Sequence, residues 1–248
     1  MKKYFRVPGD PMLPGALFSE DKFPGMHRGE HEIVILTGPQ RIFGSYGLGH
    51  IPADHMQFVL VRYEPQGVTL THIHPDQVQL YYVVSGQATV VIDKSEILMG
   101  PGCFAHIPPH EPHGFRNSGN EPLLLLDVHS YCFENEPPTT LTLDRVALRN
   151  CETREDAGDP DREIAFFVLE GEGRVTVADE TADVGKNSLV FIPRNKPYRL
   201  ANGSNATFSF LAVSSIEDRS AAASKSETIP IISPMIPADR PHTRSDRR

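Results

Sequence analysis

The stretch Tyr82-Val-Val-Ser-Gly86 recurs 85 positions later, without a gap, as Phe167-Val-Leu-Glu-Gly171. A fixed offset that preserves glycines, prolines and apolar runs over more than thirty residues indicates an internal repeat. We therefore expect two copies of one β unit. The same offset pairs Gly100 with Gly185, Ile107-Pro108 with Ile192-Pro193, Pro112 with Pro197 and Asn117 with Asn202.

Short β-rich runs bounded by Gly, Pro or Asp dominate both copies, and no segment shows a helical period of useful length. The 22 prolines and 19 glycines supply many turns, and short strands with frequent turns are typical of a sandwich or barrel. The expected fold class is therefore all-β. The expected strands are Gln57–Tyr63, Leu80–Val84, Ala88–Ile92, Phe104–Ile107, Leu123–Val128, Ile164–Leu169, Arg174–Val177, Ser188–Ile192 and Phe208–Val213.

The charge and apolar pattern exclude some classes of partner. The 248-residue chain has a formal net charge of −8, so it lacks the excess of Lys and Arg that binding to nucleic-acid phosphates requires. No stretch approaches the roughly 18 apolar residues of a membrane helix, and no apolar secretion signal follows the N-terminal lysines. We expect a cytoplasmic protein with no nucleic-acid or membrane partner. Cys103, Cys132 and Cys151 lack metal-site spacing and are expected to be buried thiols.

Four side chains in the first copy are suited to holding a metal ion. His72 and His74 are two residues apart, so both imidazoles point to one face if this segment is extended. Gln79 and Tyr81 share a face of the next strand in the same way. If those faces line the interior of a closed sheet, His113 can complete the set from a distant strand. Imidazole nitrogens suit Zn, Fe, Ni, Mn or Cu, with the glutamine carbonyl as a weaker fourth ligand.

These residues resemble the two sequence motifs of the cupin superfamily. The first motif is similar to Gly67, His72-Ile-His74, Gln79 and Gly86, although Gly67 lies one residue closer to the first histidine than usual. The second is similar to Gly102, Pro108, His113 and Asn117, with His110 at a position that is usually glycine. The resemblance covers about residues 55–130, and the repeat extends it to about 215. It implies two jelly-roll barrels in tandem and one divalent metal ion (Fe, Cu, Mn, Ni or Zn) bound by His72, His74, Gln79 and His113.

The second copy does not repeat the ligand set. Its positions 85 residues after the four expected ligands are Ala157, Asp159, Ile164 and Tyr198, so we expect a degenerate barrel without metal. The expected organisation is an N-terminal extension over residues 1–50, a metal-binding barrel over 51–135, the degenerate barrel over 136–218 and a flexible tail over 219–248. The extension contains one strand-like run, Glu32–Leu36, and is expected to pair with or wrap a barrel.

Three further residues are expected near the metal. His106 and His110 flank the site in sequence and are candidate proton carriers, although surface or loop positions fit them equally well. Tyr81 is a candidate pocket residue by strand parity, with core packing as the alternative. Gln79 itself is either a ligand or an amide that hydrogen-bonds beside a three-histidine metal.

The resemblance leaves the reaction open, because cupins include dioxygenases, isomerases, lyases and binding proteins. In quercetinase-like cupins a glutamate is both ligand and base, and the neutral Gln79 cannot be an anionic base. Three imidazoles still suffice for oxygen chemistry, so a dioxygenase acting on a small organic metabolite is the leading hypothesis. The alternatives are a non-redox isomerase or lyase with the metal as Lewis acid, as in glutamine-ligated cupin isomerases, and a non-catalytic small-molecule-binding bicupin. A homodimer is possible.

Overall fold

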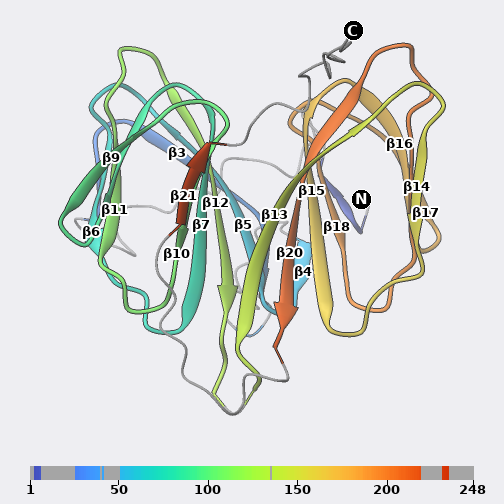
Figure 1. Cartoon of the computed structure of the whole chain (residues 1–248), viewed down its shortest axis with the longest axis horizontal. Coiled ribbons are helices and arrows are strands. Elements are labelled where there is room, and N and C mark those ends of the chain that lie inside the picture. Colours follow the sequence, from blue (N-terminus) through green and yellow to red (C-terminus); the bar gives the residue numbers. More distant parts are fainter. Residues whose placement is uncertain are drawn as a thin grey trace, which may run out of the picture.

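A computed structural model describes residues 3–6, 26–39, 41, 51–134, 136–218 and 231–234. The regular elements in these ranges are β-strands, which form four sheets. The sheets are paired into two barrels that stand side by side (Figure 1). The expected all-β fold with two tandem jelly-roll barrels is therefore confirmed.

The N-terminal barrel consists of a seven-stranded sheet that faces a five-stranded sheet. The larger sheet has the order β21 (Ile231–Pro234), β10 (Cys103–Ile107), β7 (Gln77–Ser85), β12 (Leu123–Tyr131), β5 (Met56–Tyr63), β3 (His31–Pro39) and β4 (Ile51–Ala53). The smaller sheet has the order β2 (His27–Arg28), β6 (Val68–His72), β11 (His113–Asn117), β8 (Ala88–Ile92) and β9 (Ser95–Met99). Apart from the parallel pair β3–β4, all neighbours are antiparallel.

The C-terminal barrel repeats this plan with antiparallel strands throughout. Its five-stranded sheet has the order β1 (Phe5–Arg6), β18 (Leu189–Ile192), β15 (Arg162–Glu170), β20 (Phe208–Glu217) and β13 (Thr139–Leu148). Its four-stranded sheet has the order β14 (Thr153–Asp156), β19 (Tyr198–Ala201), β16 (Glu172–Val177) and β17 (Glu180–Gly185).

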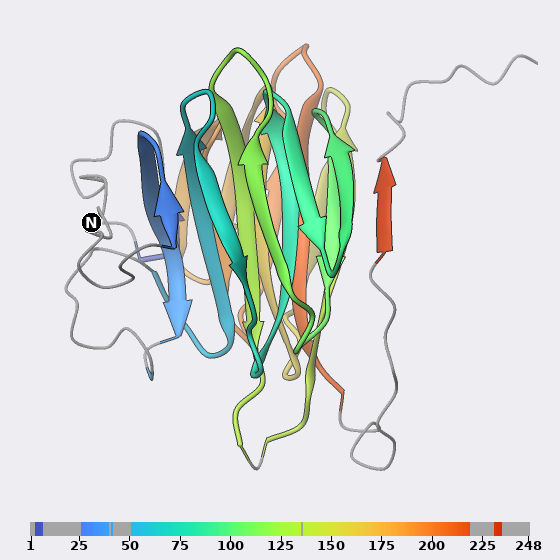
Figure 2. The same cartoon turned by 90° about the vertical axis from the view of Figure 1, so that its left-hand side faces the viewer.

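The larger sheet of each barrel is buried on both faces, and most of the side chains on these faces are apolar. In β12, Leu123 and Leu125 point into the N-terminal barrel, whereas Leu126 and Val128 belong to a separate apolar cluster that includes Phe167 from the other barrel. Figures 1 and 2 show the two large sheets packed face to face at the centre of the molecule. Burying both faces explains why these strands read as continuous apolar runs, and it joins the two barrels through one shared core.

The backbone confirms the internal repeat. Gly86 and Gly171 adopt φ angles of 84° and 75°, and a Cβ atom on Gly86 would approach the carbonyl oxygen of Pro122 to 2.6 Å. Glycine is therefore required at this turn. Asn117 donates its side-chain amide to the carbonyls of Tyr63 and Glu121, and Asn202 donates to the carbonyls of Leu148 and Ala206, all at 2.7–3.0 Å. Each of these partners is shifted by the same 85 positions.

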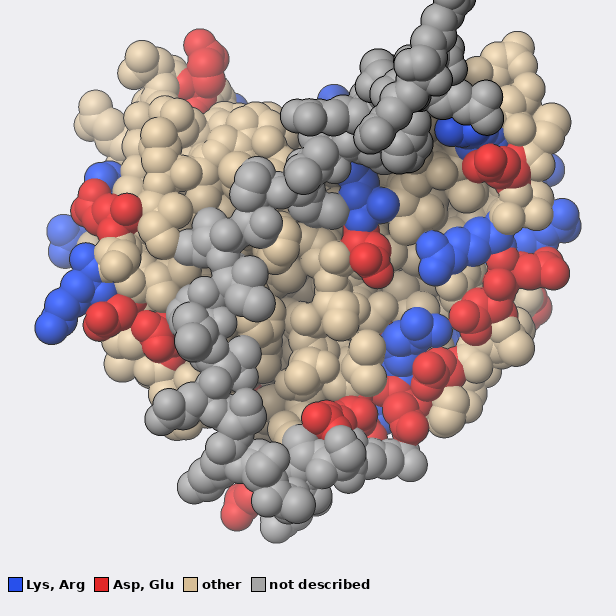
Figure 3. All heavy atoms as spheres, in the orientation of Figure 1, with Lys and Arg blue, Asp and Glu red and all other residues tan. Residues whose placement is uncertain are grey.

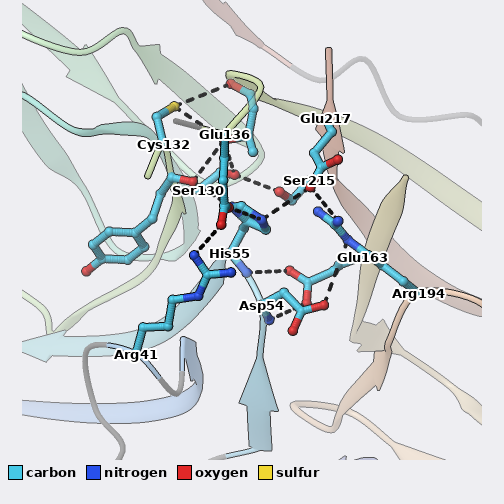
Figure 4. A network of polar contacts seen from close by, with 12 residues as sticks. Arg41, Asp54, His55, Ser130, Cys132, Glu136, Glu163, Arg194, Ser215 and Glu217 are labelled. Carbon is cyan, nitrogen blue, oxygen red and sulfur yellow. Dashed lines mark hydrogen bonds and ion pairs between the residues drawn. The ribbon is translucent and has the colours of Figure 1, made fainter. Parts of the chain in front are cut away.

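Polar contacts also join the barrels at the rim where β12 ends (Figure 4). The buried carboxylate of Glu163 accepts the backbone N–H groups of Asp54, His55 and Met56 at 2.6–3.0 Å. Burial raises the pKa of Glu163, while these three donors lower it. The hydroxyl groups of Ser130 and Ser215, which are equivalent in the repeat, are hydrogen-bonded at 2.6 Å.

The terminal segments differ in part from the expected boundaries. The run Glu32–Leu36 lies in β3, which pairs with β5 of the N-terminal barrel as expected, whereas β1 pairs with the C-terminal barrel. Residues 231–234, inside the range expected to be a flexible tail, form β21 along the edge of β10. The rest of the ranges 1–50 and 219–248 lies mostly outside the described residues. The expectation of buried thiols is wrong for Cys151, which is exposed, and Cys103 and Cys132 are only half-buried.

The surface of the described residues adds little about partners. No helix among the described residues is long and apolar enough to cross a membrane. Basic and acidic side chains are interspersed on the described part of the face in Figure 3. The expected cytoplasmic location, the lack of a nucleic-acid partner and the homodimer stay predictions.

We expect the substitution Glu163→Gln to weaken the junction between the barrels. A carboxylate accepts from all three N–H groups, but an amide must turn its own donor towards at least one of them. A buried donor left without an acceptor costs about 2 kcal/mol, which for a chain of this size lowers Tm by about 4–8 °C. Differential scanning calorimetry measures the change. The control is Glu172→Gln at an exposed position, and equal Tm values for the two variants would contradict the role assigned to Glu163.

Candidate metal centre

Strand pairing brings three histidines together inside the N-terminal barrel. His72 ends β6 and His113 begins β11, and the two are register partners in the antiparallel pair. Their ring centroids are 4.5 Å apart, and the ring of His74 lies 4.7 Å from that of His72. One ring nitrogen from each histidine lies within 4.8 Å of the others. This is the group expected from the sequence motif, and three imidazoles that converge in this way suit a divalent transition metal.

The Nδ1 hydrogen bonds of two rings turn their Nε2 atoms towards the cluster, where the Nε2 atoms of His72 and His74 lie 3.0 Å apart. The Nδ1–H of His72 donates to the carbonyl of Leu70 at 2.8 Å, and the Nδ1–H of His113 donates to the carbonyl of Glu111 at 2.7 Å. These bonds fix the tautomer that carries a lone pair on Nε2. The Nε2 atom of His113 is buried and has no partner among the described residues. Such an atom requires a ligand or a solvent molecule, and a metal ion satisfies it.

Burial also favours the uncharged rings that metal binding needs. Burial lowers the pKa of His74 to about 3, with the nearby rings of His129, His72 and His113 lowering it further. Burial likewise lowers the pKa of His113 to about 4. Both imidazoles are therefore neutral near pH 7, so a metal ion does not have to displace protons from them.

Gln79 presents its carbonyl oxygen rather than its amide nitrogen. The Nε2 group of Gln79 donates to Oδ1 of Asp127 at 2.6 Å, and because a carboxylate only accepts, this contact fixes the orientation of the amide. Its Oε1 atom is buried and has no partner among the described residues. The residue is 1% exposed. A neutral oxygen donor that is held in this way fits the fourth ligand position.

Asp127 and His129 of β12 also face this interior, and the sequence analysis missed both. Leu123 and Leu125 point inward, so the alternation of the strand turns Asp127 and His129 to the same side. The Nε2 atom of His129 lies 3.0 Å from Oδ1 of Asp127, and its ring lies 5.5 Å from that of His74. Burial raises the pKa of Asp127, but His129 and Gln79 reverse this effect and hold the pKa below its usual value. The interior therefore holds a carboxylate that contacts both a histidine and the expected amide ligand.

The three additional candidates occupy very different places. Tyr81 lies inside the barrel, with its ring 6.0 Å from that of His113, and burial raises the pKa of its hydroxyl well above the usual value. His106 lies on β10 between the core residues Ala105 and Ile107, so its side chain points to the outer face of the barrel. His110 is exposed on the loop after β10 and has a φ angle of 68°.

His106 and His110 are thus not brought to the histidine cluster. Both residues are close to His113 in sequence because only a turn separates β10 from β11. Neither ring faces the interior of the barrel. The positive φ of His110 shows instead why the motif usually has glycine there. The alternative stated for these two residues, a surface or loop position, describes His110, whereas His106 is half-buried within β10.

In the C-terminal barrel the equivalent positions hold no comparable group. Ile164 and Tyr198 belong to the apolar core of that barrel, and Ala157 is exposed. Asp159 accepts from the backbone N–H of Asp161 and lies 3.5 Å from Arg162. Among the described residues, His72, His74 and His113 are the one group with metal-ligand geometry. A C-terminal barrel without metal stays a prediction.

We expect Asp127→Asn to weaken metal binding without unfolding the barrel. The substitution keeps the size of the side chain but removes the charge that orients Gln79 and His129. Loss of such a hydrogen-bonding partner typically lowers metal affinity about 10- to 100-fold. Competition with a chelating dye for zinc measures the affinity. The control is Asp144→Asn on an exposed position of β13, and an affinity in Asp127→Asn equal to that of the control would contradict the orienting role.

Several known proteins resemble this chain. Over 63 residues it is 33% identical to glucose-6-phosphate isomerase from Thermococcus kodakarensis. The aligned stretch covers 23% of this chain and 33% of that protein. Over 62 residues it is 36% identical to quercetin 2,3-dioxygenase from Bacillus subtilis. This stretch covers 24% of this chain and 18% of that protein. The matches thus span no more than a third of these curated relatives.

Solved structures show the same fold over most of the chain. AerE from Microcystis aeruginosa aligns with a TM-score of 0.62 and 15% identity, over 87% of this chain and 100% of that chain. An oxalate decarboxylase aligns with a TM-score of 0.58 and 11% identity, over 77% of this chain and 74% of that chain. The cupin domain family matches residues 59–129 and 154–214, one match in each barrel. The chain therefore belongs to the cupin family.

Proposed function

We propose that this protein is a mononuclear metal enzyme that moves a proton on a small organic molecule, as an isomerase or lyase does. The proposed ligands are the Nε2 atoms of His72, His74 and His113 and the Oε1 atom of Gln79. The observation that carries the proposal is the Asp127–His129 pair beside this cluster, with Nε2 of His129 3.0 Å from the carboxylate. When bound, a divalent ion supplies a Lewis acid that polarises a substrate oxygen.

The side chains around that position supply the rest of the chemistry. His129 donates its Nε2–H to Asp127, so its Nδ1 atom carries the lone pair, and this atom is buried without a partner among the described residues. It can accept a proton from a substrate carbon and return it to another, while Asp127 holds the ring and stabilises its charged form. The carboxylate thus acts beside the metal, and the four ligands are neutral.

A dioxygenase is the second candidate function. A metal ion held by three histidines has coordination positions left for oxygen and substrate. The similarity to quercetin 2,3-dioxygenase supports this function. The similarity to glucose-6-phosphate isomerase supports proton transfer instead. Both matches are partial, so they do not indicate the substrate of this protein. A small-molecule-binding protein without turnover is the third possibility, and the buried Asp127–His129 pair favours an enzyme over it.

Metal analysis tests the proposed site. We expect about one metal ion per chain in the purified protein, with the metal lost in His72→Ala and His113→Ala because each removes one of four ligands. The content should persist in Gln79→Glu, which keeps an oxygen donor, and in the control His110→Gly, which suits the positive φ of that loop. Inductively coupled plasma mass spectrometry gives the stoichiometry. A wild-type protein that takes up no metal when supplied would refute the site.

The reaction class is tested by exchange and by oxygen uptake. A panel of small 2-keto acids and hydroxyketones is incubated with the protein in D₂O under argon, and deuterium incorporation is followed by NMR. The proposal expects anaerobic exchange that falls about 10²- to 10⁴-fold in His129→Asn while the metal content is unchanged. Zinc, nickel or manganese as the native metal supports this class. Iron or copper together with substrate-dependent oxygen consumption, and no anaerobic exchange, would favour the dioxygenase.

A further inference from the structure

A second set of polar side chains lines the same barrel beyond the histidine cluster. On the inward face of the seven-stranded sheet, the row that contains His129 and Gln79 is followed by the row that contains Tyr131 and Gln77. Gln57 on β5 is the register partner of His129 on the other side. The side chains of Gln57, Gln77 and Tyr131 are 5–8% exposed. We call these three residues the amide shelf.

The amide shelf lies towards the end of the barrel where β12 finishes. β12 ends at Tyr131, and its arrow points to the lower rim in Figure 1. The rings of His129 and Tyr131 are stacked with centroids 6.3 Å apart, and the Tyr131 hydroxyl donates to Oε1 of Gln57 at 2.7 Å. Residues two apart on one strand face lie about 6.6 Å apart, twice the rise per residue. The shelf is therefore within reach of a small molecule that also contacts His129.

One polar atom of the shelf is unaccounted for. Oε1 of Gln77 is buried and has no hydrogen-bond partner among the described residues. A buried amide oxygen without a partner costs about 1–3 kcal/mol, so native proteins normally satisfy such an atom with a ligand or an ordered water molecule. Because Gln77 lies two residues before Gln79 on β7, both side chains face the interior of the barrel.

In the described part of the chain, the interior around the shelf contains no lysine or arginine side chain. Among described residues with buried side chains, Arg6 is the only lysine or arginine, and its strand β1 belongs to the C-terminal barrel. Arg41 lies over the ring of Phe133 nearby, but it is largely exposed and forms an ion pair with Glu136. A phosphate or carboxylate group placed at the shelf would thus be desolvated without a lysine or arginine beside it to balance its charge.

We infer that the amide shelf binds the end of the substrate away from the metal, and that this end carries an uncharged hydroxyl group. A hydroxyl both donates and accepts, so it can satisfy Gln77 and the adjacent Tyr131–Gln57 pair in one geometry. The substrate class is then a short molecule with a metal-binding oxygen at one end and a neutral hydroxyl about two strand residues away. This inference rests on the proposed function, because it takes the metal site as one end of the ligand.

The test uses zinc-loaded protein and three catechols that differ at the end away from the chelating hydroxyls. These probes are 3,4-dihydroxybenzyl alcohol, 4-ethylcatechol and 3,4-dihydroxybenzoate, and isothermal titration calorimetry measures Kd. We expect the alcohol to bind about three- to tenfold more tightly than the ethyl compound, as one hydrogen bond to a buried amide allows. The benzoate should bind more weakly than both.

Variants at Gln77 change the amide shelf and leave the proposed metal ligands unchanged. In Gln77→Leu we expect the preference for the alcohol over the ethyl compound to disappear while zinc content stays the same. Gln77→Met serves if the leucine variant does not fold, and Gln87→Leu is the control because Gln87 is exposed on the turn after β7. The inference is overturned if the preference survives in the Gln77 variants, if the benzoate binds best, or if no probe binds zinc-loaded protein. Failure to load zinc would instead refute the proposed function first, and the inference with it.

Discussion

Strand β12 is the element on which the rest of the structure depends. It pairs with β5 on one side and with β7 on the other over its whole length. Its outward face supplies Leu126 and Val128 to the core between the barrels, and its inward face supplies Asp127 and His129 to the cluster beside the histidines. The same strand therefore joins the two barrels and sets the position of the charged pair. A shift of register by one residue would exchange these faces, so the packing of the barrels fixes the chemistry of the interior.

This double burial explains what the sequence could and could not predict. The repeat and the His72-x-His74 spacing predicted the two barrels and the histidine cluster, because turn glycines and strand parity are local properties. Asp127 and His129 were missed because β12 is buried on both faces and begins with a run of four leucines. The run Leu123–Val128 reads as one buried segment, and its alternation is hidden. Every second residue counted from Leu123 and Leu125 faces the interior of the barrel, and this count includes Asp127 and His129. The sequence alone does not show which face of the strand is the inward one.

The expectations for His106 and His110 show a different limit of sequence-based prediction. Both lie close to His113 in sequence, but β10 and the following turn direct them away from the cluster. Nearness along the chain predicts contact only when the strand face is also known. The backbone at His110 is left-handed, which explains why the motif usually has glycine at this position. Several strands, such as β13 and β9, were also missed because polar residues interrupt their apolar pattern.

The hydrogen bond between Ser130 and Ser215 joins equivalent positions of the two repeats. A hydroxyl can bond to its own copy across a two-fold axis, because it donates and accepts at once. A contact of this kind is what a single-barrel ancestor would have formed as a symmetric homodimer, before gene duplication fused its two copies. Fusion released the halves from having identical sequences. The two halves could then diverge, as at Tyr198, which stands where the first half has His113.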